Sequence, residues 1–203
     1  MNNPQAIKED REKAIAFMEM KGDIRGLSLI ADYEYVRHKL GEEGVRKVEK
    51  EMALLGHPLP LKEIKQMEFY SIGYAGVIEL AIERAHSFTM EDYYEMGRYA
   101  PKSSVILKVM LKYFASLDSA IVQATNIWRK YYTVGTLEAT EVNEKERRVI
   151  FRISGYEIAP STCHVIRGYL TQVTQMITGE QVASEERSCT FRGDPYHEIV
   201  LTW

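Results

Sequence analysis

The chain has 203 residues, of which 45% are hydrophobic and 27% charged, with a net charge of −3 and a pI near 6.0. This composition is that of an ordinary globular protein and excludes a disordered or fibrous chain. The charge balance gives no electrostatic footprint for nucleic acid, and two cysteines are too few for a secreted disulfide framework.

The amino terminus argues for a soluble protein. Its first twenty residues are charged and amphipathic, without the apolar centre of a signal peptide. No stretch reaches the roughly 20 apolar residues that a membrane-spanning helix needs. We therefore expect a cytoplasmic protein without a membrane span.

The first third of the chain has the periodicity of helices. The first helix is predicted to begin at Pro4 and to end before Gly22. Two further helices, 27–40 and 42–55, are separated by Gly41. Glycine and prolines at positions 56, 58 and 60 then predict a loop.

Helical patterns continue into the middle of the chain, each bounded by a capping residue, glycine or proline. The predicted helices are 70–85, 91–99, 105–115 and 117–132. We expect the second of them to stop before Pro101.

The period changes after Gly135 to the alternation and β-branching of strands. The predicted elements are strands 136–142 and 147–155, helix 163–177, and strands 181–192 and 196–203. This pattern predicts an α+β fold, with a helical amino-terminal half packed on a mostly antiparallel four-stranded sheet of ββαββ order.

Motifs of the common enzyme classes are missing. The sequence has no Gly-x-Gly-x-x-Gly or Walker-type phosphate loop, no Gly-x-Ser-x-Gly elbow and no His-Glu-x-x-His helix. Cys163 beside His164 or His197 is weak support for nucleophilic catalysis. We therefore do not expect an enzyme.

Both cysteines lie in the last third, where a metal site can be built. Cys189 and His197 are each four residues from Gly193, so a hairpin centred there sets them opposite one another, about 5 Å apart at Cβ. Cys163 opens the predicted helix, where free amides favour its thiolate. Glu186 faces the other way in a regular strand and joins only if there is a bulge or if the strand starts later. The alternative is two cysteines buried as small apolar residues, with His197 exposed.

The last ~70 residues resemble the 4-vinyl-reductase domain, a small-molecule-binding domain related to haem–nitric-oxide sensors and to Golgi tethering-complex subunits. The resemblance rests on Trp128-x-x-Tyr-Tyr-x-x-Gly135, a cysteine in the next helix, and Glu186-x-x-Cys189 before the closing hairpin. We therefore divide the chain into a helical segment, 1–60, outside the clear resemblance, and a ligand-binding domain, 61–203.

The resemblance implies a zinc site. In phenol- and xylene-responsive activators of this family, Cys, Glu, Cys and Cys hold zinc at intervals of 23, 3 and 8 residues. The same intervals join Cys163, Glu186, Cys189 and His197, with histidine in place of the last cysteine. Four protein ligands leave no open position, so the zinc is expected to be structural. His164 is a competing ligand.

The resemblance also implies a small apolar or aromatic ligand and a signal passed to a partner protein or within a homodimer. The residues expected to line the pocket are Met110, Phe114, Trp128 and Tyr132. The alternative is a scaffold like the tethering subunits. We do not expect haem, because no tyrosine begins the Tyr-x-Ser-x-Arg motif of the haem sensors, and His86 at a helix end is explained by the helix dipole.

Overall fold

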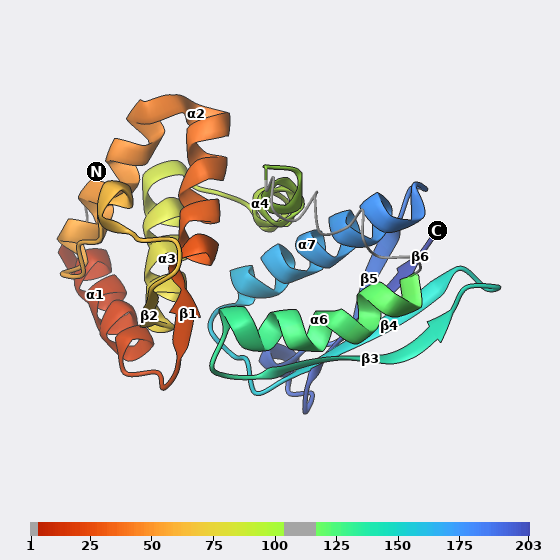
Figure 1. The fold of residues 1–203 in the computed structure, drawn as a ribbon. Helices are drawn as coiled ribbons and strands as arrows, with labels where there is room; N and C mark the ends of the chain where they lie inside the picture. Colours follow the sequence, from red (N-terminus) through yellow and green to blue (C-terminus); the bar gives the residue numbers. More distant parts are fainter. Residues whose placement is uncertain (1–3, 104–116) are drawn as a thin grey trace. The chain divides into compact units, whose positions relative to one another are not determined.

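The computed structural model describes residues 4–103 and 117–203 (Figure 1). The chain forms two compact units, Met1–Thr89 with Tyr131–Thr133, and Met90–Lys130 with Val134–Trp203. In the described residues, no helix has both the length and the apolar content needed to cross a bilayer. The boundary at residue 60, drawn from the extent of a family resemblance, stays a prediction.

The first unit is mainly helical, as the sequence indicates. Its helices are α1 (Pro4–Met18), α2 (Gly26–Leu54), the short η1 (Leu61–Glu63) and α3 (Gly73–His86). The two helices predicted on either side of Gly41 form α2, which breaks at that glycine (φ 70°, ψ −172°). A positive φ costs glycine little, so the chain changes direction there without strain.

A small hairpin in this unit was not predicted. Strand β1 (Asp23–Arg25) pairs antiparallel with β2 (Phe69–Ser71), and Ile24 also bridges to Tyr132. The prediction of helix for Tyr70 and Ser71 is therefore wrong. Strands of three residues are too short to show the two-residue period by which a strand is recognised.

An ion-pair network joins the three long helices of the first unit. Arg84 of α3 pairs with Asp10 of α1 and, at 2.8 Å, with Glu51 of α2. The Arg84 side chain is 13% exposed, so water screens these pairs less than it screens surface pairs.

Replacing Arg84 by methionine is expected to lower the free energy of unfolding by about 2 kcal/mol, because the half-buried Glu51 and Asp10 carboxylates lose this guanidinium, although Asp10 keeps its pair with Lys13. Arg46→Met, which breaks the exposed pair with Glu43, is the matched control and should change stability by less than about 0.5 kcal/mol. Urea denaturation of both variants measures the difference. Equal effects would show that the Arg84 network contributes no more than a surface pair.

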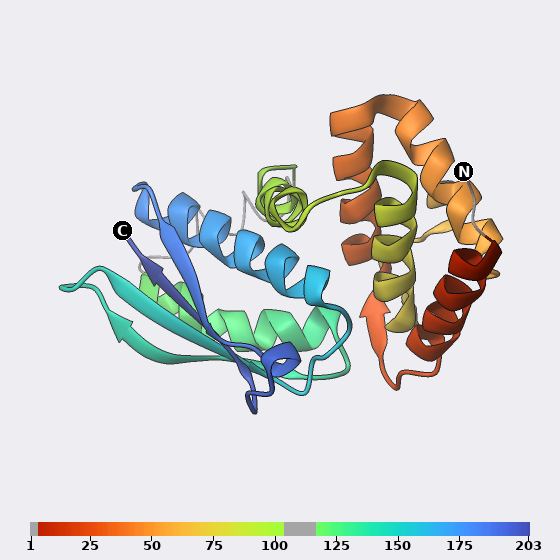
Figure 2. The same ribbon diagram turned by 180° about the vertical axis from the view of Figure 1, so that it is seen from behind.

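The second unit is an α+β domain in which helices cover one face of a sheet (Figures 1 and 2). Its helices are α4 (Met90–Ser103), α6 (Leu117–Tyr131), α7 (Pro160–Thr178) and the short η2 (Thr190–Arg192). Its strands are β3 (Thr136–Asn143), β4 (Arg148–Ser154), β5 (Ala183–Ser188) and β6 (His197–Thr202). The sheet order is β3-β4-β6-β5 and every pairing is antiparallel. The predicted α+β class and ββαββ order are confirmed.

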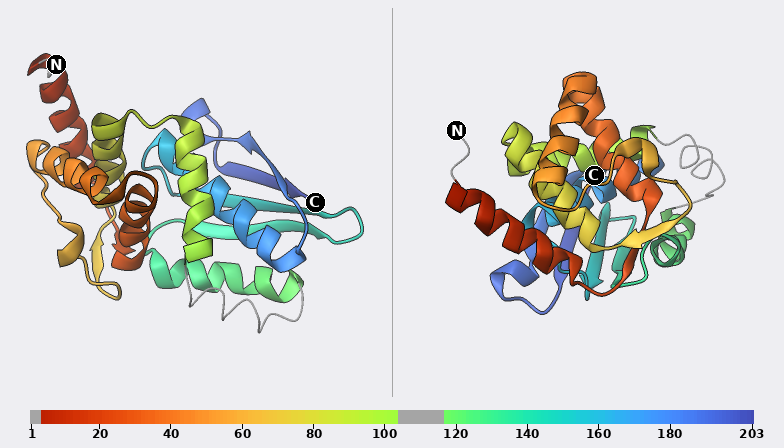
Figure 3. Two further views of the ribbon diagram at one scale, coloured as in Figure 1. Left: turned by 90° about the horizontal axis from the view of Figure 1, so that it is seen from above. Right: turned by 90° about the vertical axis from the view of Figure 1, so that its left-hand side faces the viewer.

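Helices α4 and α7 cross in direct backbone contact (Figure 3, left). A Cβ added at Gly97 of α4 would lie 1.9 Å from the carbonyl oxygen of Val165, and one added at Gly168 of α7 would lie 2.0 Å from that of Tyr94. Glycine is therefore required on both sides of the crossing. Helix α4 also continues through Pro101, against the prediction. Because this proline lies two residues from the helix end, it removes only one amide donor from the last turn, and the helix tolerates that loss.

Candidate metal centre

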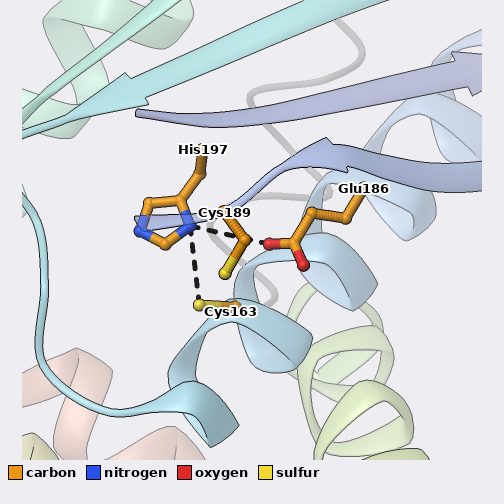
Figure 4. A group of neighbouring side chains, drawn as sticks. All are labelled: Cys163, Glu186, Cys189 and His197. Carbon is orange, nitrogen blue, oxygen red and sulfur yellow. Dashed lines mark hydrogen bonds and ion pairs between the residues drawn. The ribbon is translucent and has the colours of Figure 1, made fainter. Parts of the chain in front are cut away.

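Four side chains of the second unit converge at one end of the sheet (Figure 4). Cys163 lies in the first turns of α7, Glu186 in β5, Cys189 just after β5, and His197 at the start of β6. Their potential ligand atoms all lie within 4.8 Å of one another. The structure thus brings together the four residues that the spacing singled out.

The hairpin geometry explains how they meet. Ser188 pairs with Glu198, so Cys189 and His197 stand opposite one another at the next position. The register shifts between Glu186 and Ser188, which is the bulge that Glu186 needs in order to join the same face. Beyond Cys189 the chain turns through η2 and Gly193, whose φ is 91°.

The distances suit a tetrahedral cation. His197 Nδ1 lies 3.6 Å from Cys163 Sγ and 3.6 Å from Glu186 Oε1. Zinc bonds of about 2.3 Å to sulfur and about 2.0 Å to nitrogen or oxygen place neighbouring ligand atoms about 3.3–3.8 Å apart. A cavity of about 10 Å³, lined in part by Cys163, Glu186 and His197, lies among them. That is about the room that one water molecule needs, which is enough for one ion.

The charges of the cluster also favour a cation. Two thiolates and one carboxylate would bring three negative charges to a bound cation, and the Arg192 guanidinium lies 3.1 Å from Glu186 Oε2. Burial raises the pKa of Glu186, but the contact with His197 and the charge of Arg192 outweigh burial and hold that pKa below its ordinary value. The other oxygen, Oε1, is buried and has no hydrogen-bond partner in the described chain.

Three residues around the cluster were not found from the sequence. Asp194 Oδ2 accepts a hydrogen bond from the Cys189 amide at 2.8 Å. The Thr190 hydroxyl lies 2.9 Å from His197 Nε2. Arg192 holds Glu186, as described above. They all belong to the turn between β5 and β6, and only their closeness in sequence to Cys189 could have pointed to them.

Neither competing interpretation of these residues fits the geometry. His197 is 3% exposed, whereas the alternative of purely structural cysteines placed it in water. His164 lies outside the cluster, and its Nδ1 is 3.5 Å from the Arg167 guanidinium. Burial and the charge of Arg167 lower the pKa of His164.

Of the four residues predicted to line a ligand pocket, Trp128 and Tyr132 belong to the described part of the chain. Trp128 is buried in the second unit, where its indole donates to the carbonyl oxygens of Val134 and Gly135 and meets Tyr156 edge-on. Tyr132 belongs to the first unit. Met110 and Phe114 lie outside the described residues. The pocket stays a prediction.

Comparisons with known proteins relate the chain to others by structure. No family model matches, and no curated protein matches by sequence. Among solved structures, an H-NOX protein from S. oneidensis in the Fe(II)NO ligation state has a TM-score of 0.65 and 12% identity, over 88% of this chain and 98% of that one. An oxygen-binding H-NOX domain related to soluble guanylate cyclases has a TM-score of 0.64 and 13% identity, over 88% and 94%.

A third similar structure corrects the expectation about haem. It comes from a study of haem distortion in the H-NOX family, with a TM-score of 0.65 and 13% identity, over 89% of this chain and 95% of that one. The sequence-based expectation that haem is absent is contradicted by this likeness to haem-binding domains. In this chain, His86 Nε2 lies 3.0 Å from the carbonyl oxygen of Gly44. At 12–13% identity, the comparisons show that the chain has the fold of H-NOX domains.

Proposed function

We propose that the chain is a non-catalytic sensory domain of the 4-vinyl-reductase-like kind, in which one zinc ion is bound by Cys163, Glu186, Cys189 and His197. The observation that carries the proposal is the convergence of four metal-binding side chains, three of them buried, on an ion-sized cavity. Two thiolates, one imidazole and one carboxylate are a donor set that suits zinc.

The zinc would tie the β5–β6 hairpin to the amino-terminal end of α7. Four protein ligands leave no coordination position for water or substrate, which supports a structural role. The sensory role is supported by the shared fold, because the similar H-NOX structures include an oxygen complex and a nitric oxide complex. We propose that this chain binds a small apolar or aromatic molecule and signals through a partner protein or a second copy.

Elemental analysis of the full chain, purified without a histidine tag, tests the metal site. We expect about one equivalent of zinc, lost in Cys163→Ala/Cys189→Ala and weakened in Glu186→Ala. Glu185→Ala is the matched control, because Glu185 is the neighbouring strand residue, exposed and paired with Arg187. Wild-type protein that is stable and free of metal, or zinc retained by the double variant, would contradict the proposal.

Thermal-shift measurements with a panel of monocyclic aromatic compounds, and with haemin in parallel, test the ligand. A shift with an aromatic compound supports the proposal. A haemin complex with a Soret band would replace the proposed ligand by haem. A protein that responds to neither would overturn the sensory role.

A further inference from the structure

We infer that Thr190 determines which nitrogen of His197 binds the metal, by holding the proton of Nε2 so that Nδ1 is the ligand. The inference rests on the proposed zinc site and adds a positioning residue to it.

The two ring nitrogens of His197 face different surroundings. Nδ1 faces the cluster, 3.6 Å from both Cys163 Sγ and Glu186 Oε1. Nε2 faces away from it and lies 2.9 Å from Thr190 Oγ1. A nitrogen that binds a metal carries no proton, so a neutral imidazole ligated through Nδ1 keeps its proton on Nε2. That N–H needs an acceptor, and the Thr190 hydroxyl is at hydrogen-bond distance.

The surroundings of the ring make this hydrogen bond important. His197 is 3% exposed, and the Phe191 ring packs against it with centroids 6.0 Å apart. Water therefore has little access to replace the hydroxyl, and a buried N–H without an acceptor is costly. Thr190 directly follows the ligand Cys189, so one dipeptide supplies both a ligand and the residue that orients another ligand.

Glu186 is oriented in the same way. Arg192 engages Oε2 at 3.1 Å, and the buried Oε1 has no hydrogen-bond partner among the described residues and lies 3.6 Å from His197 Nδ1. His197 and Glu186 thus each have one side-chain atom, Nε2 or Oε2, held by a residue of the β5–β6 turn. The other atom, Nδ1 or Oε1, is left to bind the metal. Such outer partners commonly change metal affinity by about 10–100-fold when they are removed.

The first experiment is long-range ¹H–¹⁵N NMR of the zinc-loaded full chain labelled at histidine. We expect the His197 proton on Nε2 and the metal on Nδ1. Bound zinc with the proton on Nδ1 would overturn this inference and leave the proposed zinc site intact. A chain that binds no zinc would instead contradict the proposed site itself, so the two failures are distinguishable.

The second experiment compares zinc affinities by competition with a chelator. Thr190→Val should weaken binding by about 10–100-fold, and Thr190→Ser, which keeps the hydroxyl, should restore most of it. Thr171→Val is the matched control, because it removes a buried hydroxyl that donates to the Arg167 carbonyl of its own helix. It should leave affinity unchanged.

A double variant separates positioning from packing. In His197→Cys the ligand binds through a single sulfur and has no ring to orient. Adding Thr190→Val in this background should therefore not lower the affinity for zinc any further. An equal loss in both backgrounds would show that Thr190 acts through the fold and would overturn the inference. If Thr190→Val does not fold, the NMR result on the wild-type protein decides.

Discussion

Gly97→Ala is expected to lower the free energy of unfolding by about 3 kcal/mol. The new Cβ would lie 1.9 Å from the Val165 carbonyl oxygen, a backbone atom that can move only if α4 and α7 separate. Gly168→Ala should have a similar effect, because its Cβ would lie 2.0 Å from the Tyr94 carbonyl oxygen. Separating the helices also loosens α7, which carries Cys163.

Urea denaturation measures this loss, with Gly179→Ala as control. Gly179 ends α7 with a φ of 74° and has no atom within 4 Å of the added Cβ. Replacing Gly179 by alanine should lower the free energy of unfolding by only about 1–2 kcal/mol, which is the cost of a left-handed backbone conformation for a residue with a Cβ. A Gly97→Ala variant no less stable than this control would show that the two helices do not cross in backbone contact.

Metal removal is expected to have the other large effect. A ligand that binds only the folded chain stabilises it by about 4 kcal/mol when its free concentration is a thousand times its dissociation constant. A chelator should remove this contribution, because Cys163 and the β5–β6 hairpin are then no longer joined through the ion. Acid should act in the same direction, since protons compete with the metal for thiolates and imidazole.

Thermal unfolding with and without a chelator provides the measurement. The wild-type midpoint should fall on chelation, while that of Cys163→Ala/Cys189→Ala should already be low and should not respond. A midpoint that is equal with zinc and with chelator, in protein shown to contain zinc, would mean that the ion does not stabilise the fold.

Much of the fold could be predicted because its elements are long and periodic. The hairpin around Gly193 could be predicted because four residues separate Gly193 from both Cys189 and His197, and an antiparallel turn sets such positions opposite one another. The bulge between Glu186 and Ser188 could be named only as a condition for Glu186 to join the site. In a strand as polar as β5, a register shift of one residue does not change the pattern of apolar and polar residues. The β1–β2 hairpin was missed because three-residue strands carry too little pattern.

The surroundings of the site depend on tertiary structure, which spacing does not reveal. Thr190 and Arg192 are residue types that occur in any polar turn. Their contacts with His197 and Glu186 depend on how η2 directs their side chains, which the sequence does not reveal. For Trp128, whose aromatic character predicts a place in a pocket, the structure adds that the indole donates to the carbonyl oxygens of Val134 and Gly135. The pocket itself stays a prediction. The likeness to haem-binding H-NOX domains lies in the fold, at an identity too low for residue patterns to carry it.

Zinc K-edge X-ray absorption of the tag-free protein tests most directly whether these four side chains share one ion. The proposed site predicts two sulfur neighbours at about 2.3 Å and two nitrogen or oxygen neighbours at about 2.0 Å, with the sulfur signal absent in Cys163→Ala/Cys189→Ala. A zinc shell without sulfur, or a protein that holds no zinc at all, would contradict it.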